Sequence, residues 1–337
     1  MKRLFSVIII LCAAISAQAT VVLTEDFNYT AGSALEGQGT PNKWTVSTNT
    51  NNAQTASVPL TVSASGLTME YYGAGDAATG LGVTMPQVTL SPESSRQRVT
   101  YKMFDTGSSY KTGSLYAAFL INVSEATSST RDFLAFDGNT GTTQRGRLFI
   151  KKSGSGYVLG VTRGGTTPVW SDILSIGETY LAVFKYEIVS GDLNDIVSLY
   201  VNFPLGHDEY ATGVQAKCVK SNDFDSSTAD PSQLKAMSLK QREGGSALQL
   251  SHLRVATTWE EAVNYTGPNI EPEDPNKPVY LIEEGFDTNG NWTVIRSCCR
   301  CSQSGRLEHA NNQRHIYRGA GFPLQRHLYG QESYCSV

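Results

Sequence analysis

The stretch "GETYLAVFKYEIVSGDLNDIVSLYVNF" (177–203) decides the fold. Two apolar, β-branched and aromatic runs flank the turn-forming segment "GDLND" (191–195), which is the pattern of a long antiparallel hairpin. In the second run, side chains alternate between an apolar face and a mixed face, as in a sheet that packs on one side. The apolar face carries Val197, Leu199, Val201 and Phe203, and the mixed face carries Ile196, Ser198, Tyr200 and Asn202.

The same alternation recurs along most of the chain, with Gly, Ser, Asn and Asp between the runs. Short, frequent strands joined mainly by hairpins are typical of an antiparallel sandwich, so the sequence predicts an all-β domain of two sheets. The predicted strands are 59–73, 96–105, 113–123, 132–138, the pair within 146–165, 179–189, 195–203, 234–244 and 246–256.

The N-terminus predicts export. Lys2 and Arg3 precede an apolar run to Ile15, and Ala17 and Ala19 fit a cleavage site, so residues 1–19 are expected to be a signal peptide rather than a membrane anchor. Its removal lowers Lys plus Arg from 27 to 25 against 31 acidic residues, a net charge of −6. This acidity argues against nucleic acid as the main partner and leaves a secreted or cell-surface location.

Composition divides the remainder. The sandwich is expected over 20–265, and "TGPNIEPEDPNKP" (266–278) reads as an extended linker because it carries four of the twelve prolines. "VYLIEEGFDTNGNWTV" (279–294) repeats features of "VVLTEDFNYTAGSALEGQGTPNKWTV" (21–46), which predicts the start of a second β module over 279–295. Only 43 residues follow Val294, too few for a second sandwich of similar size, so this module is expected to be truncated.

Residues 296–337 have a different composition, with six Arg, no Lys and four of the six Cys. The spacing of Cys298, Cys301, His309 and His315 resembles a zinc site, but few apolar residues surround these ligands. A disulfide-stapled tail is a second interpretation, although the exported chain has an odd number of Cys. A shift of reading frame near codon 295 is the interpretation we favour, because it accounts for both the composition and the missing body of the module.

Three segments resemble the concanavalin A-like lectin/glucanase jelly rolls, specifically the laminin-G-like modules of exported bacterial proteins. They are "EDFNYTAGSALEGQG" followed by Trp44, the hairpin 177–203, and "LQLSHLRVATTWEEAV" (248–263). The resemblance covers most of 20–265 and implies a jelly-roll sandwich with its first and last strands close together, seating Phe27 near Leu253 and Val255. It implies no particular ligand, because this fold carries lectins, hydrolases, lyases and structural modules alike.

Catalytic residues are not evident in the sequence. Hydrolases that share the resemblance carry Glu-x-Asp-x-x-Glu on one strand, and the chain has no such strand. His207, Asp208 and Glu209 form a polar cluster in a predicted loop without a nucleophile at an identifiable spacing. We therefore expect a non-catalytic module that binds carbohydrate or mediates surface adhesion. A polysaccharide-degrading enzyme or its accessory domain, and a structural spacer without a ligand, stay open as alternatives.

Two sets of side chains are candidate ligand contacts. Aromatic residues in or beside turns offer stacking surfaces for sugars, whereas Trp44 and Trp259 are expected to pack in the core. Acidic side chains in "SNDFDSSTAD" (221–230) offer oxygen ligands for calcium, a cofactor frequent in related folds, although Asp is also a common turn residue. The carbohydrate candidates are Tyr71, Tyr72, Tyr110, Tyr157 and Trp170, and the calcium candidates are Asp223, Asp225 and Asp230.

Overall fold

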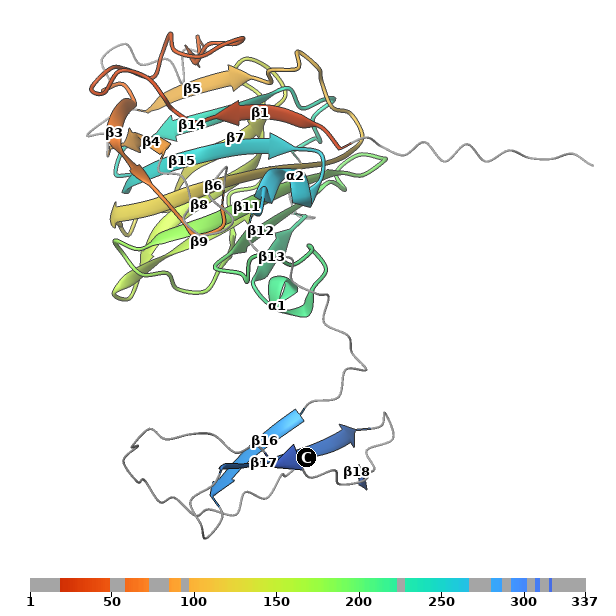
Figure 1. The fold of residues 1–337 in the computed structure, drawn as a ribbon. Coiled ribbons are helices and arrows are strands. Elements are labelled where there is room, and N and C mark those ends of the chain that lie inside the picture. Colours follow the sequence, from red (N-terminus) through yellow and green to blue (C-terminus); the bar gives the residue numbers. More distant parts are fainter. Residues whose placement is uncertain are drawn as a thin grey trace, which may run out of the picture. The chain divides into compact units, whose positions relative to one another are not determined.

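The computed structural model describes residues 19–48, 58–72, 85–91, 97–222 and 228–266, together with the backbone of four strands after residue 279. The chain forms two units, Met1–Glu271 and Pro272–Val337. The first unit contains two antiparallel sheets (Figure 1). Among the described residues, no helix is long and apolar enough to cross a membrane.

One sheet has eight strands, and it brings the two ends of the domain together. β1 (Val21–Glu25) pairs with the last long strand, β15 (Ala247–Ala256), with Leu23 opposite Val255 and Glu25 opposite Leu253. This pairing confirms the expected closeness of the first and last strands. The other strands follow in the order β13 (Cys218–Ser221), β12 (Ile196–Val201), β11 (Thr179–Ile188), β6 (Gly113–Glu125), β15, β4 (Met85–Leu90) and β3 (Thr61–Leu67).

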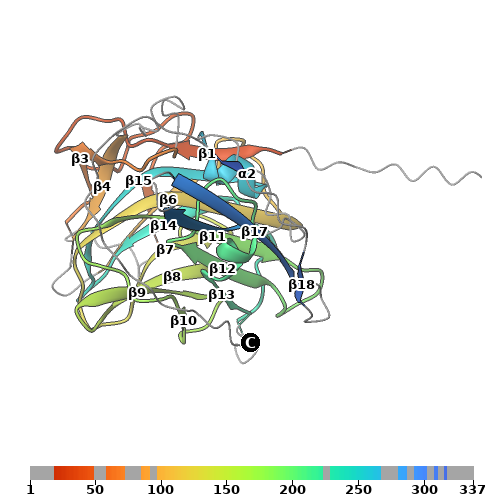
Figure 2. The same cartoon turned by 60° about the horizontal axis from the view of Figure 1, so that its bottom comes forward.

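The other sheet has seven strands. Its centre is formed by β7 and β14, which lie far apart in the sequence but pair side by side. Its edge next to β9 is the two-residue strand β10 (Figure 2). The order is β10 (Val169–Trp170), β9 (Gly156–Thr162), β8 (Gln144–Ser153), β7 (Arg131–Asp137), β14 (Ala236–Gln241), β5 (Arg98–Met103) and β2 (Thr45–Val46).

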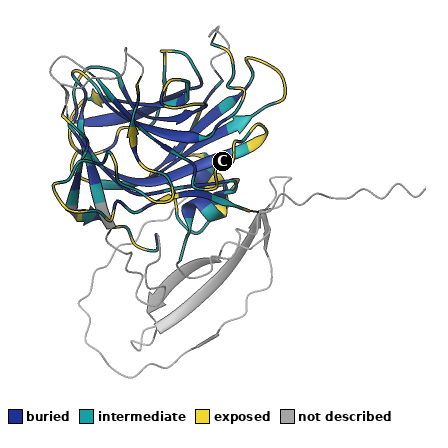
Figure 3. Cartoon of the chain, turned by 90° about the horizontal axis from the view of Figure 1, so that it is seen from above, coloured by how far each residue is buried: buried dark blue, intermediate teal, exposed yellow. Residues whose placement is uncertain are grey.

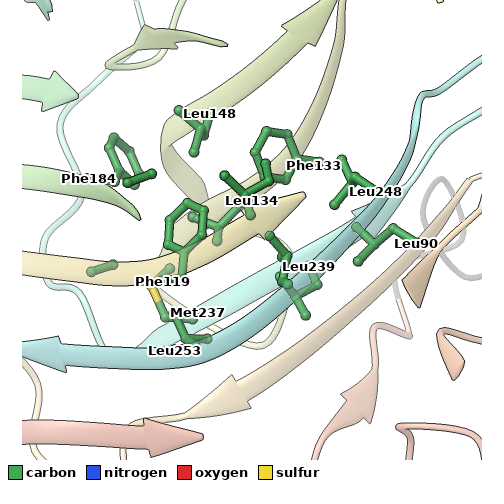
Figure 4. Packing of buried hydrophobic residues seen from close by; sticks show 14 of the residues in the cluster. Leu90, Phe119, Phe133, Leu134, Leu148, Phe184, Met237, Leu239, Leu248 and Leu253 are labelled. Carbon is green, nitrogen blue, oxygen red and sulfur yellow. The ribbon is translucent and has the colours of Figure 1, made fainter. Parts of the chain in front are cut away.

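The main core lies between the two sheets. Phe119 and Phe184 from the eight-stranded sheet meet Leu134, Met237 and other apolar side chains of the seven-stranded sheet (Figure 4). Most buried residues lie in the strands, and the connecting loops are mainly intermediate or exposed (Figure 3). The all-β, two-sheet jelly-roll sandwich predicted from alternation is therefore confirmed.

A second apolar layer covers the outer face of the eight-stranded sheet. Trp259, at the start of α2 (Trp259–Val263), lies edge-on to Tyr200 of β12, with ring centroids 5.0 Å apart. The short helix α1 (Thr212–Gln215) adds Val214 to the same layer. Both faces of β12 are consequently buried, whereas alternation alone predicted one mixed face. The layer also confirms the predicted core position of Trp259, as the main core does for Trp44.

The second unit is described by its backbone pairing alone. β16 (Tyr280–Phe286) pairs with β17 (Trp292–Cys301), which also pairs with β18 (Leu307–His309) and β19 (His315–Ile316). β17 runs past Ile295, where the sequence predicted the strand pattern to end. The signal peptide up to residue 18, and 267–278 of the predicted linker, lie outside the described residues. The frame-shift interpretation of 296–337 stays a prediction.

Candidate functional site

The outer face of the seven-stranded sheet gathers charged and aromatic side chains. Leu148 and Ile150 of β8 and Met237 of β14 point into the main core, so their neighbours along each strand point outward. The outward set combines Arg147, Phe149 and Lys151 of β8 with Asp132 of β7, Ser238 and Lys240 of β14, Arg242 after β14, and Trp170 of β10. We call this set the outer basic face.

Its centre is a buried carboxylate that several cations share. Lys240 donates a hydrogen bond to Asp132 Oδ2, Arg242 Nε lies 3.2 Å from Asp132 Oδ1, and Arg147 Nη1 lies 3.9 Å from Asp132 Oδ2. The side chains of Asp132 and Lys240 are only 1% and 4% exposed, whereas those of Arg147 and Arg242 reach solvent. One carboxylate therefore faces three cations.

A register shift in β7 turns Asp132 into this position. The pairing of β7 with β8 shifts between Asp132 and Leu134, so Phe133 and Leu134 both reach the core while Asp132 lies opposite Phe149 on the outer face. A bulge of this kind re-aims a side chain without ending the strand.

The three cations set the ionisation of the carboxyl group. Burial alone would raise the pKa of Asp132, but Lys240, Arg242 and Arg147 together outweigh it and lower this pKa. Burial lowers the pKa of Lys240, against the opposing effect of Asp132. Three cations converge on this one carboxylate, so the lowered pKa of Asp132 decides the protonation state of the Asp132–Lys240 pair. Asp132 stays ionised at neutral pH.

The aromatic part of the face lies at the β9–β10 edge. Trp170 pairs with Gly160, and a Cβ atom at Gly160 would stand 2.6 Å from Trp170 Cε3, so the absence of a side chain lets the indole ring lie against β9. Lys151 Nζ is 4.3 Å from the centroid of this ring, and the Arg147 guanidinium is 5.1 Å from the centroid of Phe149. Trp170 is half-buried, so part of its indole ring packs against the protein and part is exposed to solvent.

The arrangement is a surface rather than a deep pocket. A cavity lined in part by Asp132, Lys240 and Arg242 opens beside the cluster, with a volume of only about 10 Å³. This is room for about one water molecule. A molecule larger than water that binds at this cluster would have to lie across its surface.

A second carboxyl group, Asp137, lies at the far end of β7. It accepts hydrogen bonds from Ser238 Oγ at 2.8 Å and from the backbone N–H of Asn139 at 2.7 Å, and burial raises its pKa. Asp132 and Asp137 are five residues apart on one strand, a separation of about 16 Å at ~3.3 Å per residue. The paired carboxyl groups of glycoside hydrolases stand only about 5 to 9.5 Å apart. This pair does not have the spacing of a hydrolase.

Of the predicted sugar-contacting aromatics, only Trp170 lies on the outer basic face. The expected exposure of Tyr72 and Tyr157 is wrong: these side chains are 2% and 0% exposed. Tyr72 donates its hydroxyl to the carbonyl of His252, and Tyr157 is in phase with the inward residues of β9. Tyr71 and Tyr110 are half-buried and pack against other aromatic rings away from this sheet face, Tyr71 against Tyr265 and Tyr110 against Phe104.

The calcium candidates are only partly described. Asp223 and Asp225 lie outside the described residues. Asp230 pairs with the buried Arg163 guanidinium and accepts the backbone N–H of Asn194 at 2.8 Å, so it joins two loops. Within the described part of the chain, no group of three or more His, Cys, Asp or Glu side chains could hold a metal ion. A calcium site stays a prediction.

The polar cluster at 207–209 has a structural role. Glu209 is buried under the α2 layer and accepts hydrogen bonds from the hydroxyls of Tyr116 at 2.7 Å and Tyr200 at 2.6 Å, and from Lys185 Nζ at 2.9 Å. These donors outweigh burial and lower the pKa of Glu209. Lys185 Nζ also lies 3.5 Å from Glu187 Oε2, so two carboxylates share this cation, and the cluster ties the loop after β12 to the eight-stranded sheet.

No protein-family model matches the chain, and no curated protein matches it. The globular domain of T. cruzi calreticulin is 12% identical, over 73% of this chain and 91% of that one, with a TM-score of 0.38. A human gut-microbiota protein described with endo-acting O-glycanases is 10% identical, over 71% and 100%, at 0.38. An alginate lyase from Alteromonas sp. 272 is 8% identical, over 50% and 86%, at 0.32. Likenesses at these TM-scores carry no argument about function, so a proposal for this chain rests on its own side chains.

Proposed function

We propose that the protein is a carbohydrate-binding module whose outer basic face lies along a glycan chain. The observation that carries the proposal is the Trp170 ring, supported by the bare backbone of Gly160 and bordered by Lys151 and Phe149. An aromatic ring that packs against a strand with polar donors beside it is the kind of surface on which a pyranose ring stacks.

Cationic hydrogen-bond donors lie on the strand next to this ring. Lys151 lies over Trp170, and Arg147 lies over the neighbouring Phe149. The Lys151 ammonium must turn aside when a sugar stacks on Trp170. That movement costs little, since an exposed cation–π contact is worth about 0.5–1 kcal/mol.

Binding fits the described residues better than catalysis. Asp132 is held ionised by three cations, and Asp137 is fully buried and committed to Ser238 and Asn139. Neither carboxyl group is arranged to donate a proton to a glycosidic oxygen while the other attacks or activates water. A polysaccharide-degrading activity is therefore the second candidate, to be scored in the same experiment.

The test is affinity electrophoresis of the protein and its Trp170→Ala variant through gels containing single polysaccharides. Loss of the stacking ring should weaken binding to the retarding polymer about tenfold, equivalent to about 1.4 kcal/mol. Tyr210→Ala is the matched control, because Tyr210 is an exposed aromatic residue away from this face.

Equal retardation of the two variants would show that the outer basic face is not the binding surface. Release of reducing or unsaturated ends from the same polymers would replace the binding proposal with the enzymatic one.

A further inference from the structure

We infer that the glycan taken by the outer basic face is acidic, bearing carboxylate or sulfate groups that contact Arg242, Arg147 and Lys151. This inference rests on the proposed function and specifies its ligand class. The outer basic face carries the cations Arg147, Lys151, Lys240 and Arg242 against the carboxylate Asp132, and Asp137, which is bonded to Ser238, is the carboxylate at its border.

The positive excess is concentrated where the cluster meets solvent. Asp132 is the only anion among three cations, and Lys240 already takes one of its oxygens as a direct hydrogen-bond partner. The two guanidinium groups also donate hydrogen bonds to neutral oxygens, Arg147 to the carbonyls of Gly164 and Gly165 and Arg242 to Gln97 Oε1, and these partners do not balance their charge. An anion from outside, within hydrogen-bond distance of Arg242, would relieve their mutual repulsion.

Guanidinium geometry favours the same ligand. Arg242 holds Asp132 through Nε and the neutral Gln97 amide oxygen through Nη1, and its side chain is 28% exposed, so a carboxylate or sulfate can approach Nη2 and take the place of Gln97 in a two-oxygen contact. Lys151 adds a compact charge beside the stacking ring. A sugar ring on Trp170 would therefore place its anionic substituents between Lys151 and the Asp132 cluster.

This excess is local. The whole chain is acidic, with a net charge of −4 and an isoelectric point near 5.8, so a generally basic protein does not account for it. On the eight-stranded sheet, Lys185 lies 2.9 Å from Glu209 Oε1 and 3.5 Å from Glu187 Oε2, and Arg254 pairs with Glu261, so each of these cations has at least one carboxylate of its own. Only the outer basic face leaves cations in excess of their partners among these described clusters.

The experiment compares polymers that share a backbone but differ in charge. Polygalacturonate is paired with its fully methyl-esterified form, and a sulfated galactan with its desulfated form, and each is titrated with the protein. We expect at least tenfold tighter binding to one charged member of a pair, and a loss of this preference as NaCl rises from 20 to about 500 mM. The two pairs distinguish a carboxylate from a sulfate ligand.

The variants assign the preference to this face. Arg242→Gln should reduce affinity for the charged polymer about fivefold and leave affinity for the neutral one unchanged. Arg254→Gln is the matched control, since its arginine is 25% exposed, is paired with a glutamate, and lies on the other sheet. Thermal melts check folding. If Arg242→Gln does not fold, Lys151→Gln replaces it, with Lys111→Gln as the control because Lys111 is an exposed lysine in the loop before β6.

Each outcome decides a different claim. Equal affinity for charged and neutral polymers, with binding still dependent on Trp170, overturns the acidic ligand but keeps glycan binding. A charge preference that survives both Arg242→Gln and Lys151→Gln overturns the assignment to this face. Absence of binding to every polymer overturns both proposals.

Discussion

Tyr157 brings a phenol hydroxyl into the apolar space between the sheets. The residue is fully buried, and its hydroxyl finds no hydrogen-bond partner among the described residues. Burial raises the pKa of Tyr157, which keeps the hydroxyl neutral. An unpaired buried hydroxyl destabilises the folded state by about 1–3 kcal/mol. Packing of the Tyr157 ring in the core offsets part of this cost.

Replacing Tyr157 with Phe should therefore raise the free energy of unfolding by about 1 kcal/mol, as measured by urea denaturation. The control is Tyr186→Phe, whose hydroxyl donates to Asp195 at 2.9 Å and whose loss should lower stability by about 1–3 kcal/mol. A similar loss of stability in both variants would show that Tyr157 has a polar partner after all.

Gly160 is the residue that makes room for the stacking ring. Gly160→Ala should push Trp170 off β9, because the new Cβ atom would stand 2.6 Å from the indole and 2.8 Å from Pro168 Cβ. We expect glycan affinity to fall by a factor close to that of Trp170→Ala, with a smaller loss of stability. Gly154→Ala is the control substitution in the nearby turn, where a Cβ meets no atom within 4 Å, although its positive φ adds backbone strain. Unchanged affinity in Gly160→Ala would mean that the ring position does not matter.

For single residues, the alternation of side chains along a strand predicts burial correctly, whereas closeness to a turn wrongly predicts exposure. Tyr157 was expected at the surface because it follows the turn 154–156. Its spacing of two from Leu159 and of four from Val161 places it on the inward face of β9. The opposite phase of "RLFIK" puts Arg147, Phe149 and Lys151 outward together, a signal that was present in the sequence.

At the scale of elements, the β7–β14 pair holds the charged cluster together. Asp132→Asn should lower the free energy of unfolding by about 3 kcal/mol at pH 7, because Lys240 and two arginines would lose their shared anion. Since the folded-state pKa of Asp132 lies below its unfolded value of about 3.9, this stabilisation is complete above about pH 5. It disappears as the pH falls through the lower, folded pKa.

The measurement is the stability of wild type and Asp132→Asn between pH 7 and pH 2. The gap between the two proteins should stay constant down to about pH 5 and then narrow. Glu209 also has a lowered pKa, so the stability gap between wild type and Glu209→Gln should likewise narrow below about pH 5. A gap for Asp132→Asn that persists unchanged to pH 2 would mean that the carboxylate is not stabilised by these cations.

The longer elements followed from the sequence, and their pairing did not. All nine predicted runs contain strands. The six-residue strand β4 was not predicted, and β10 and β13 are too short to show a period. The start of α2 had a readable signal, since Thr258 caps it by accepting the backbone N–H of Glu261. Asp132 and Lys240 are 108 residues apart, and only the pairing of β7 with β14 and the register shift in β7 bring them together. No local pattern contains that information.

At the scale of the whole molecule, the sandwich is closed by its own ends. β1 lies against β15, and Glu25 at the end of β1 accepts hydrogen bonds from Trp44 Nε1 at 2.8 Å and Lys102 Nζ at 2.9 Å. The first strand therefore links both sheets, although it is only five residues long.

A fragment of residues 20–266 should unfold in one cooperative transition with a midpoint within about 2 °C of that of the longer chain. A fragment of residues 28–266 lacks β1 and Glu25, leaves Lys102 buried without this carboxylate, and should fail to fold cooperatively. Differential scanning calorimetry distinguishes the two. Cooperative folding of the shorter fragment would show that closure by β1 is dispensable.

The central claim is that sugars bind across the outer face of the seven-stranded sheet. The most direct measurement is a ¹H–¹⁵N NMR titration of the protein with an acidic oligosaccharide drawn from its tightest-binding polymer. The account predicts that shifts concentrate at the Trp170 indole N–H, Gly160, Phe149 and Arg242. Shifts that concentrate instead around Tyr116 and Lys185 of the eight-stranded sheet and Trp259 of α2, which covers it, would contradict this claim.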